Sequence, residues 1–522
     1  MKTSHHLLAV LVAGACVQAG AADGKNSWIT VGESAYAALQ KIAPQAVARE
    51  SRIVRSNDMR SKIPATEQVR LVEISDAEMR ELGEAIHREL KRCGGFMYHA
   101  SEAEGRRHLS RQATPAGANT QAALARPAYV IDNQAVVPPV LTRMQASNIG
   151  QTIGELAGYA NRYYTTTGGT GASNFLQQKW AGMASGRGDI GVTQFTHAGY
   201  AQKSVIATIT GSDNASEVIV IGAHLDSISS SGSGENMRAP GADDDASGIA
   251  SMTEVLRAIV ASCYKPRRTI KLIGYAAEEV GLRGSQAIAA SFKAANVNVV
   301  GVMQLDMTNY KGSASDIYIY TDYTDTLQNE FIAKLITAYQ PDLTIGYDKC
   351  GYGCSDHASW TAQGYPASLP FEASFNQSNP YIHTASDTYA NTGSQAAHAL
   401  KFARLAASFA IELGSDGPGV VIPVDRVETF TGTLSRGQKR SFGPFKAGAG
   451  GNFKAETTGT GDTDLYVRRS SVPTTSAYNC KSDGPSSTET CTIALTANGD
   501  VYVLLNGYTA ASYSLKVTYR PQ

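Results

Sequence analysis

One stretch of the chain combines an apolar strand, a histidine and a run of carboxylates. An apolar segment ends near Ile221, His224 and Asp226 follow it, and the residues from Ala239 to Gly248 read APGADDDASG, after which a helical pattern begins. Imidazole nitrogens and carboxylate oxygens are ligands that zinc accepts. In open α/β sheets, ligands collect beyond the carboxyl ends of the strands. The stretch therefore predicts a metal site at the end of a strand in an α/β fold.

The region 128–414 alternates short apolar runs with amphipathic segments. The expected strands are 205–210, 218–221, 270–275, 299–305 and 317–320. One expected helix places Ile249, Met252, Leu256 and Ile259 on one face, and two further helices are expected over 287–295 and 331–339. Several of the strands are uninterrupted apolar runs, which indicates a sheet covered on both faces. The pattern predicts a doubly wound α/β domain with a mostly parallel sheet.

Further candidate ligands lie beyond other expected strands. Glu278 and Glu279 follow one strand, Asp306 follows another, and His383 lies in the sequence PYIHT. Taken singly, an Asp or His at a strand end is more often a helix cap or a satisfied hydrogen-bonding group. Together, two histidines and three carboxylates supply the ligands of a two-metal site, in which one carboxylate bridges the ions. Asp244, in the middle of three aspartates, is the expected bridge.

The spacing of the candidate residues also indicates different chemical roles for neighbouring side chains. His224 and Asp226 are two apart, so on an extended backbone they point the same way. We expect Asp226 to accept the second imidazole N–H of His224 and to fix its tautomer. The side chains of Glu278 and Glu279 diverge because the residues are adjacent, so one of them should bind metal while the other handles protons.

The sequence CGYGCSDH begins at Cys350 and predicts a disulfide-closed loop. Glycines at positions 351 and 353 allow the tight turn that a bond between Cys350 and Cys354 needs. A Cys-x-x-x-Cys metal clip is the alternative. A closed loop would hold Tyr352 rigidly, which suits a phenol that donates a hydrogen bond to a developing oxyanion. The other interpretation of Tyr352 is an exposed loop tyrosine.

The start of the chain resembles an export signal. A lysine at position 2, an apolar run over 7–15 and small residues up to position 22 predict a signal peptide over residues 1–21. Lipidation at Cys16 is the alternative. Export would place the chain in an oxidising compartment, where we expect a second disulfide between Cys480 and Cys491. Cys263 is expected to be a free, buried thiol. Cys16 and Cys93 lie in segments that we expect to be removed.

The balanced charge of the chain does not favour a strongly anionic partner. Lys plus Arg and Asp plus Glu each number 46, so nothing points to nucleic acid or an anionic membrane. No segment after the signal reaches the roughly 20 apolar residues of a membrane-spanning helix.

Two smaller units flank the central domain. Residues 22–127 contain an expected strand at 68–74 and an expected helix after it. Ser75 and Glu78 form a capping box at the start of this helix, and Gly94 and Gly95 end it. An irregular linker is expected over 102–127. Residues 420–522 contain short alternating runs at 424–434, 443–455, 463–467, 500–505 and 512–519, which predict a small β-sandwich.

The motifs resemble those of the secreted bacterial leucyl aminopeptidases, which are di-zinc exopeptidases. HLDS at 224, APGADDDASG at 239, YAAEEVG at 275, LDM at 305 and CGYGCSDH at 350 carry the resemblance, in unbroken order. It implies that His224 and Asp306 bind one zinc, that Glu279 and His383 bind the other, and that Asp244 bridges them. It also implies Glu278 as general base, Asp226 behind His224, Tyr352 as oxyanion donor, and a cis peptide between Asp244 and Asp245.

The same resemblance implies an activity and a substrate pocket. The expected reaction is hydrolysis of the first peptide bond, with two zinc ions activating a water. The pocket wall would consist of Met307, Tyr320, Tyr352, Leu369, Phe371, Phe375, Ser378 and Ile382, which favours large hydrophobic first residues such as Leu. Alternatives are a carboxypeptidase or glutaminyl cyclase of the same superfamily, or a non-catalytic surface-binding protein. A buried core cluster is the other interpretation of Phe371 and Phe375.

The flanking units have their own resemblances. The N-terminal unit is placed like the propeptides of such enzymes, which implies an inhibitor or folding assistant and a processing protease that removes it. The C-terminal unit is similar to the prepeptidase C-terminal domain of secreted bacterial peptidases.

Overall fold

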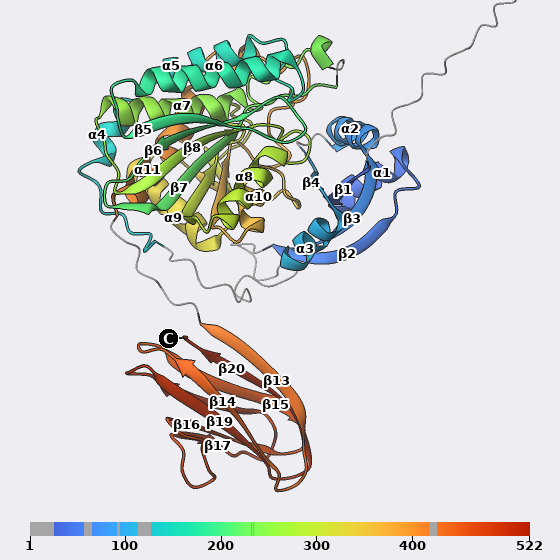
Figure 1. The fold of residues 1–522 in the computed structure, drawn as a ribbon, viewed down its shortest axis with the longest axis vertical. Coiled ribbons are helices and arrows are strands. Elements are labelled where there is room, and N and C mark those ends of the chain that lie inside the picture. The colour runs from blue at the N-terminus through green and yellow to red at the C-terminus, as the bar shows by residue number, and fades with distance from the viewer. Residues whose placement is uncertain are drawn as a thin grey trace, which may run out of the picture.

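The computed structural model describes residues 26–56, 65–90, 94–112, 127–230, 232, 234–416 and 425–521. The expected signal peptide, its cleavage site, Cys16, Cys93 and the linker residues 113–126 lie outside these ranges. Within them the chain forms three units, each with its own sheet and its own apolar core. Figure 1 shows the N-terminal unit in blue, the α/β unit in green and yellow, and the C-terminal sandwich in orange and red.

The N-terminal unit is an antiparallel sheet in the order β2-β3-β1-β4, covered by helices. Its elements are β1 (Asn26–Val31), α1 (Glu33–Ile42), β2 (Ala48–Ser56), β3 (Ala65–Ser75), α2 (Asp76–Ala85), a π-helical turn (Ile86–Leu90), β4 (Phe96–His99) and α3 (Glu102–Gln112). The capping box is confirmed, since the Ser75 hydroxyl accepts the Glu78 N–H and the Glu78 carboxylate accepts the Ser75 N–H.

The expectation of an irregular linker from residue 102 is wrong for its first part. Residues 102–112 form α3, which packs on the sheet by burying Leu109 against Val69 and Leu71. Arg106 adds ion pairs to Glu50 and Glu102. Leu109 is the only large apolar residue between positions 102 and 112, so the sequence of this helix shows little apolar periodicity.

The central unit contains an eight-stranded sheet in the order β11-β10-β12-β9-β7-β8-β6-β5. The strands are β5 (Ile190–Phe195), β6 (Ser204–Ile209), β7 (Asn214–His224), β8 (Arg268–Tyr275), β9 (Asn298–Gln304), β10 (Ile317–Tyr320), β11 (Ile345–Asp348) and β12 (Ala367–Phe371). The four strands β12-β9-β7-β8 run parallel. The sheet as a whole is mixed, because β6 pairs antiparallel with both β8 and β5, and β10 pairs antiparallel with β12.

Helices cover both faces of this sheet, as Figure 1 shows. They are α4 (Val137–Leu141), α5 (Ala146–Ala157), α6 (Thr167–Ala184), α7 (Ala246–Ala261), α8 (Arg283–Ala294), α9 (Thr326–Tyr339), α10 (His357–Ala362) and α11 (Ala397–Ser415), with 3-10 turns at Gly234–Asn236 and Tyr389–Thr392. On β7, Ile219 and Ile221 pack into the core shared with α5, α7 and α11, whereas Val218 and Val220 pack into the core shared with α8 and α10. This two-sided burial explains the uninterrupted apolar run and confirms the α/β class.

The C-terminal unit is a sandwich of two antiparallel sheets, β13-β20-β15-β18 and β14-β19-β16-β17. Its strands are β13 (Arg426–Leu434), β14 (Lys439–Ala447), β15 (Asn452–Thr460), β16 (Thr463–Arg469), β17 (Cys480–Ser482), β18 (Glu489–Ala494), β19 (Gly499–Gly507) and β20 (Ala511–Tyr519). The segment 443–455, expected as one strand, is two, because Gly448 to Gly451 turn the chain between sheets. Aromatic and aliphatic side chains fill the space between the sheets.

Both expected disulfides are present. The S–S distances are 1.99 Å for Cys350–Cys354 and 2.23 Å for Cys480–Cys491, so the alternative of a metal clip at Cys350 is wrong. The expectation of a buried Cys263 is also wrong: its thiol is free and exposed, because the residue follows the last turn of α7 at the surface. None of the helices in the described ranges has the length and apolar character to cross a bilayer.

Candidate active site

The candidate ligands meet at the carboxyl edge of the parallel strands. His224 is the last residue of β7, Glu278 and Glu279 follow β8, and Asp306 follows β9. Since β8, β7 and β9 are adjacent and parallel, these side chains gather at one edge of the sheet, where α/β folds bind ligands. His383 comes from the segment after β12.

Three consecutive aspartates connect β7 to α7 and face different partners. Asp245 caps α7 by accepting the Gly248 N–H at 2.8 Å. Its carboxylate also accepts the backbone N–H of His224 at 2.9 Å and of Met307 at 3.1 Å. The peptide between Asp244 and Asp245 is cis, as the resemblance implied. Through its hydrogen bonds to His224 and Met307, Asp245 ties together the three segments that carry His224, Asp244 and Asp306.

Asp244 lies between two groups of candidate metal ligands. One of its oxygens is 2.9 Å from His224 Nε2, and the other is 3.2 Å from His383 Nε2. The His224 nitrogen is also 3.6 Å from Asp306, and the His383 nitrogen is 2.8 Å from Glu279. The five side chains form two groups, His224–Asp244–Asp306 and Asp244–Glu279–His383, whose ligand atoms lie within 4.8 Å of one another and which share Asp244.

The carboxylates of the site are buried without enough hydrogen-bond donors. Among the described residues, none donates a hydrogen bond to Asp306 Oδ1, to Glu279 Oε1 or to either oxygen of Glu278. A buried carboxylate in this state needs a cation nearby. Imidazole and carboxylate are the donors that zinc accepts, so the residues present fit zinc.

Burial and neighbouring charges shift the pKa values in opposite directions. Burial raises the pKa of Glu278 well above its ordinary value and raises that of Glu279 to about 7. Burial alone would raise the pKa of Asp244 as well, but hydrogen bonds with His224 and His383 lower it below its ordinary value. The pKa of Asp244 is thus lower than that of Glu279, and the raised pKa of Glu278 means that its carboxylate binds a proton more tightly than an exposed glutamate does.

Asp226 lies behind His224, but its contacts differ from the expectation. The Nδ1 atom of His224 is 3.1 Å from the backbone oxygen of Asp226 and 3.6 Å from its carboxylate. The backbone carbonyl is therefore the hydrogen-bond acceptor that fixes the tautomer. The carboxylate instead accepts the backbone N–H of Glu278 at 2.9 Å and of Glu279 at 3.2 Å.

Asp387 is a residue of the site that sequence analysis missed. Its carboxylate accepts the backbone N–H of Asp243 at 3.1 Å and of Asp244 at 3.0 Å, and its backbone oxygen accepts the Ala242 N–H at 3.1 Å. It lies four residues after His383, so it ties the loop of His383 to the loop of Asp244. Its proximity to His383 in the chain was the only signal.

Arg162 and Ser355 were also missed. The buried Arg162 guanidinium donates to the backbone oxygens of Leu225 and Gly241, each at 2.9 Å, and so joins the two ends of the segment between His224 and Asp244. The Ser355 hydroxyl donates to Asp306 at 2.5 Å. Ser355 follows Cys354 directly in an obvious motif, whereas Arg162 lies in a segment without any pattern.

An apolar pocket opens beside the ligands. It has an empty volume of about 360 Å³, and its lining residues are Asp306, Met307, Cys350, Tyr352, Cys354, Ser355, Leu369, Phe371, Phe375, Ser378 and Ile382. Tyr320 is not among them: its buried ring lies 4.9 Å from Phe371, and its phenol donates to the Ala373 oxygen at 3.2 Å. Tyr320 supports the pocket wall from behind, because β10 pairs with β12, which carries Leu369 and Phe371.

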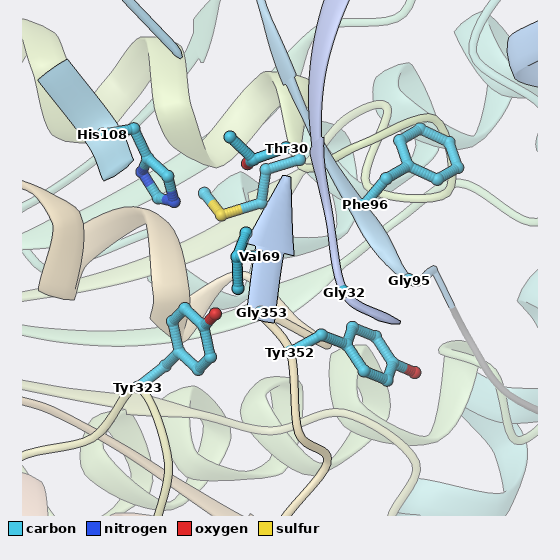
Figure 2. Close-up of a pocket in the computed structure, with 10 residues that line it drawn as sticks. Thr30, Gly32, Val69, Gly95, Phe96, His108, Tyr323, Tyr352 and Gly353 are labelled. Atoms are coloured by element: carbon cyan, nitrogen blue, oxygen red, sulfur yellow. The ribbon is translucent and has the colours of Figure 1, made fainter. Parts of the chain in front are cut away.

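Figure 2 shows a second cavity, between the N-terminal unit and the loop that carries Tyr352. Gly32, Gly95 and Phe96 face Tyr323, Tyr352 and Gly353 across it. The Tyr98 N–H donates to the Gly281 oxygen at 3.1 Å, and the Arg283 guanidinium lies 4.1 Å from the Tyr98 ring centre. The N-terminal unit therefore contacts the loop after Glu278 and Glu279 as well as the Tyr352 loop.

Together, the α/β fold and two histidine–carboxylate groups that share one aspartate define a metal-dependent hydrolase. Residues 204–409 match peptidase family M28, and residues 444–507 match the bacterial pre-peptidase C-terminal domain. The chain belongs to peptidase family M28 and is a zinc-dependent aminopeptidase.

Similar proteins are known by sequence and by structure. Leucine aminopeptidase 1 of Grosmannia clavigera is 35% identical over 357 residues, which cover 66% of this chain and 85% of that protein. The LapA aminopeptidase of Legionella pneumophila is 31% identical with a TM-score of 0.62, over 76% of this chain and 100% of that one. LapB of the same organism is 28% identical with a TM-score of 0.60, over 75% of this chain and 100% of that one.

Proposed function

We propose that this protein is a secreted aminopeptidase that uses two zinc ions to remove the first residue of peptides and proteins, with a preference for large hydrophobic residues such as Leu. One observation carries the proposal. Asp244 lies between His224 and His383, with one carboxylate oxygen toward each. Such an arrangement suits a carboxylate that bridges two ions.

His224 and Asp306 would hold one zinc, Glu279 and His383 the other, and Asp244 both. A zinc pair supplies Lewis-acid chemistry, lowering the pKa of water toward about 7 and drawing electrons from the carbonyl of the first peptide bond. Asp226 orients both sides of this site, through its backbone oxygen to His224 and its carboxylate to the Glu278 N–H.

Glu278 is the proposed general base. Its carboxylate is buried and accepts no hydrogen bond from the described residues, so it is free to accept a proton from the attacking water. The water oxygen bonds to the carbonyl carbon, the Tyr352 phenol donates a hydrogen bond to the resulting oxyanion, and the C–N bond then breaks. Glu278 returns the proton to the leaving amine.

The apolar pocket accounts for the proposed preference. Met307, Leu369, Phe371, Phe375 and Ile382 supply its apolar wall next to Asp306. Burial of a leucine side chain in such a wall contributes about 1.5 to 3 kcal/mol. The adjoining carboxylates suit a free α-ammonium group, which a blocked amino terminus lacks.

Matched peptides test this function. The enzyme should release leucine from a leucyl peptide with a free amino terminus and should not act on the same peptide after N-acetylation. Release of the C-terminal residue instead would favour the carboxypeptidase alternative, and conversion of an N-terminal glutamine to pyroglutamate would favour the cyclase. Absence of all three activities in a zinc-loaded protein would favour a non-catalytic binding protein.

We also propose the division of the chain into a signal peptide (1–21), a propeptide with its processing linker (22–127), a catalytic domain (128–414) and a C-terminal prepeptidase-type domain (420–522). The two disulfides support secretion, because such bonds persist outside reducing compartments. Amino-terminal sequencing of the protein recovered from the medium would test both cleavage sites.

The N-terminal unit is proposed to inhibit the enzyme or assist its folding until a processing protease removes it. Its contacts with Gly281 and with the Tyr352 loop support this role. A specific protease site inserted within residues 113–126 would test it. Activity should rise after cleavage if the unit inhibits, whereas the yield of active enzyme refolded without the unit should fall if it assists folding.

A further inference from the structure

Asp322 lies just beyond β10, outside the metal site, and is almost completely buried. Its two carboxylate oxygens accept the backbone N–H of Cys350 at 3.1 Å and of Gly351 at 2.6 Å. These are the two residues immediately before Tyr352. Two successive N–H groups that converge on one carboxylate form a concave anion site in the backbone.

The backbone at Gly351 makes this convergence achievable. Gly351 has a φ of 87°, in the left-handed region that favours glycine. In this conformation the N–H groups of Cys350 and Gly351 both reach Asp322, and the chain then turns to present Tyr352 to the pocket. The disulfide between Cys350 and Cys354 closes the loop but does not attach it to the sheet. Asp322 provides that attachment.

The opposite side of the loop faces the N-terminal unit. A Cβ atom at Gly351 would lie 3.3 Å from a carboxylate oxygen of Glu67, and one at Gly353 would lie 3.0 Å from the Met97 sulfur. Those contacts disappear if the N-terminal unit is removed. The hydrogen bonds from Asp322 belong to the catalytic domain itself and would persist in the mature enzyme.

We infer that Asp322 is a positioning residue for turnover: through the backbone N–H groups of Cys350 and Gly351 it holds the Tyr352 phenol where the oxyanion develops. The inference rests on the proposed role of Tyr352. A displacement of about 1 Å of a group that stabilises a transition state can cost about 100-fold in rate. Asp322→Asn should act in this way, because the two N–H groups bond to different carboxylate oxygens and the amide replaces one of these with an NH2 group that cannot accept a hydrogen bond.

A double-mutant cycle tests this inference. Asp322→Asn should lower kcat about 10- to 100-fold, with little change in KM and no change in zinc content. In a Tyr352→Phe background the same substitution should lower kcat less than about threefold, because residues that act through one group are not additive. Asp322→Ser, whose shorter side chain removes the two acceptors without placing an NH2 group against an N–H, should also lower kcat and serves as the second variant if Asp322→Asn does not fold.

Asp348 provides a matched control. It ends the neighbouring strand β11, and its carboxylate accepts the Phe375 N–H at 3.0 Å and the Lys349 N–H at 2.9 Å. Asp348→Asn should disturb the pocket wall, raise KM and combine multiplicatively with Tyr352→Phe. The inference is overturned if Asp322→Asn keeps full kcat, or if its effect multiplies undiminished with that of Tyr352→Phe. If Tyr352→Phe alone keeps full kcat, the proposed role of Tyr352 fails, and the inference fails with it.

Discussion

The carboxylate of Asp226 accepts a hydrogen bond from the backbone N–H of Glu278 at 2.9 Å. The backbone oxygen of the same aspartate is the acceptor for His224. One residue thus connects the end of β7, which carries a candidate metal ligand, to the turn after β8, which carries the candidate general base. The position of the base is coupled to that of the ligand through the main chain.

Glu278→Gln should keep the fold and the zinc but lower kcat about 10²- to 10⁴-fold, because the amide cannot accept a proton. Steady-state kinetics with a leucyl anilide, together with zinc analysis, would measure this. Glu254→Gln is the matched control: Glu254 is a buried glutamate on α7 that binds Arg257, and its replacement should leave kcat within about threefold. Full activity of Glu278→Gln would refute its role.

Substitution of single ligands should remove different amounts of zinc. Asp244→Asn weakens both proposed sites, so zinc content should fall from about two per chain toward zero, whereas Glu279→Gln weakens one site and should retain about one. Metal analysis after dialysis against a weak chelator would distinguish them. Both variants should also melt at a lower temperature than the zinc-loaded enzyme, since bound metal stabilises the native state. Equal zinc loss in both variants would argue against a shared bridge.

His197 should make the catalytic unit less stable in acid. Burial lowers its pKa to about 4, from an ordinary value near 6.5. Below the ordinary value the unfolded chain binds a proton that the native state excludes. The free energy of unfolding should therefore fall as the pH drops from about 6.5 to about 4, and this residue contributes roughly 2 to 3 kcal/mol of the loss.

Denaturant unfolding at pH 7 and pH 4.5 would measure this loss, with a chelator present so that zinc binding does not contribute. The loss should be smaller in His197→Gln, whose side chain has no proton to gain. An equal loss in the wild type and the variant would mean that His197 does not contribute.

Ser378→Tyr should narrow the pocket. Ser378 lies among the lining residues with Phe371 and Phe375, and a phenol ring there would occupy space that a leucine side chain needs. The ratio of kcat/KM for leucyl over alanyl substrates should fall about 10-fold or more, a typical value for loss of fit in an apolar pocket. The alanyl substrate serves as the internal control, and an unchanged ratio would place the specificity pocket elsewhere.

Features that depend on neighbouring residues could be predicted from the sequence. Strands β6 to β10 of the central sheet, the Ser75–Glu78 capping box and the short disulfides follow from local spacing, and each is present, whereas β5, β11 and β12 were not predicted. The exposed position of Cys263 and the extent of α3 were not predicted. Each depends on which distant residues pack against it in the folded chain, as Val69 and Leu71 do against Leu109 of α3.

The candidate ligands could be proposed from the sequence because their residue types are chemically selective and three of them follow recognisable strands. His224, Glu279 and Asp306 each lie beyond a strand that an apolar run predicts, and parallel strands bring their carboxyl ends to one edge. Tertiary structure alone decided which atoms meet. The Asp387 carboxylate reaches the Asp244 N–H across 143 residues of sequence, and no periodicity encodes such a contact. Main-chain hydrogen bonds between distant segments depend on the direction of each N–H group, which only the folded chain sets.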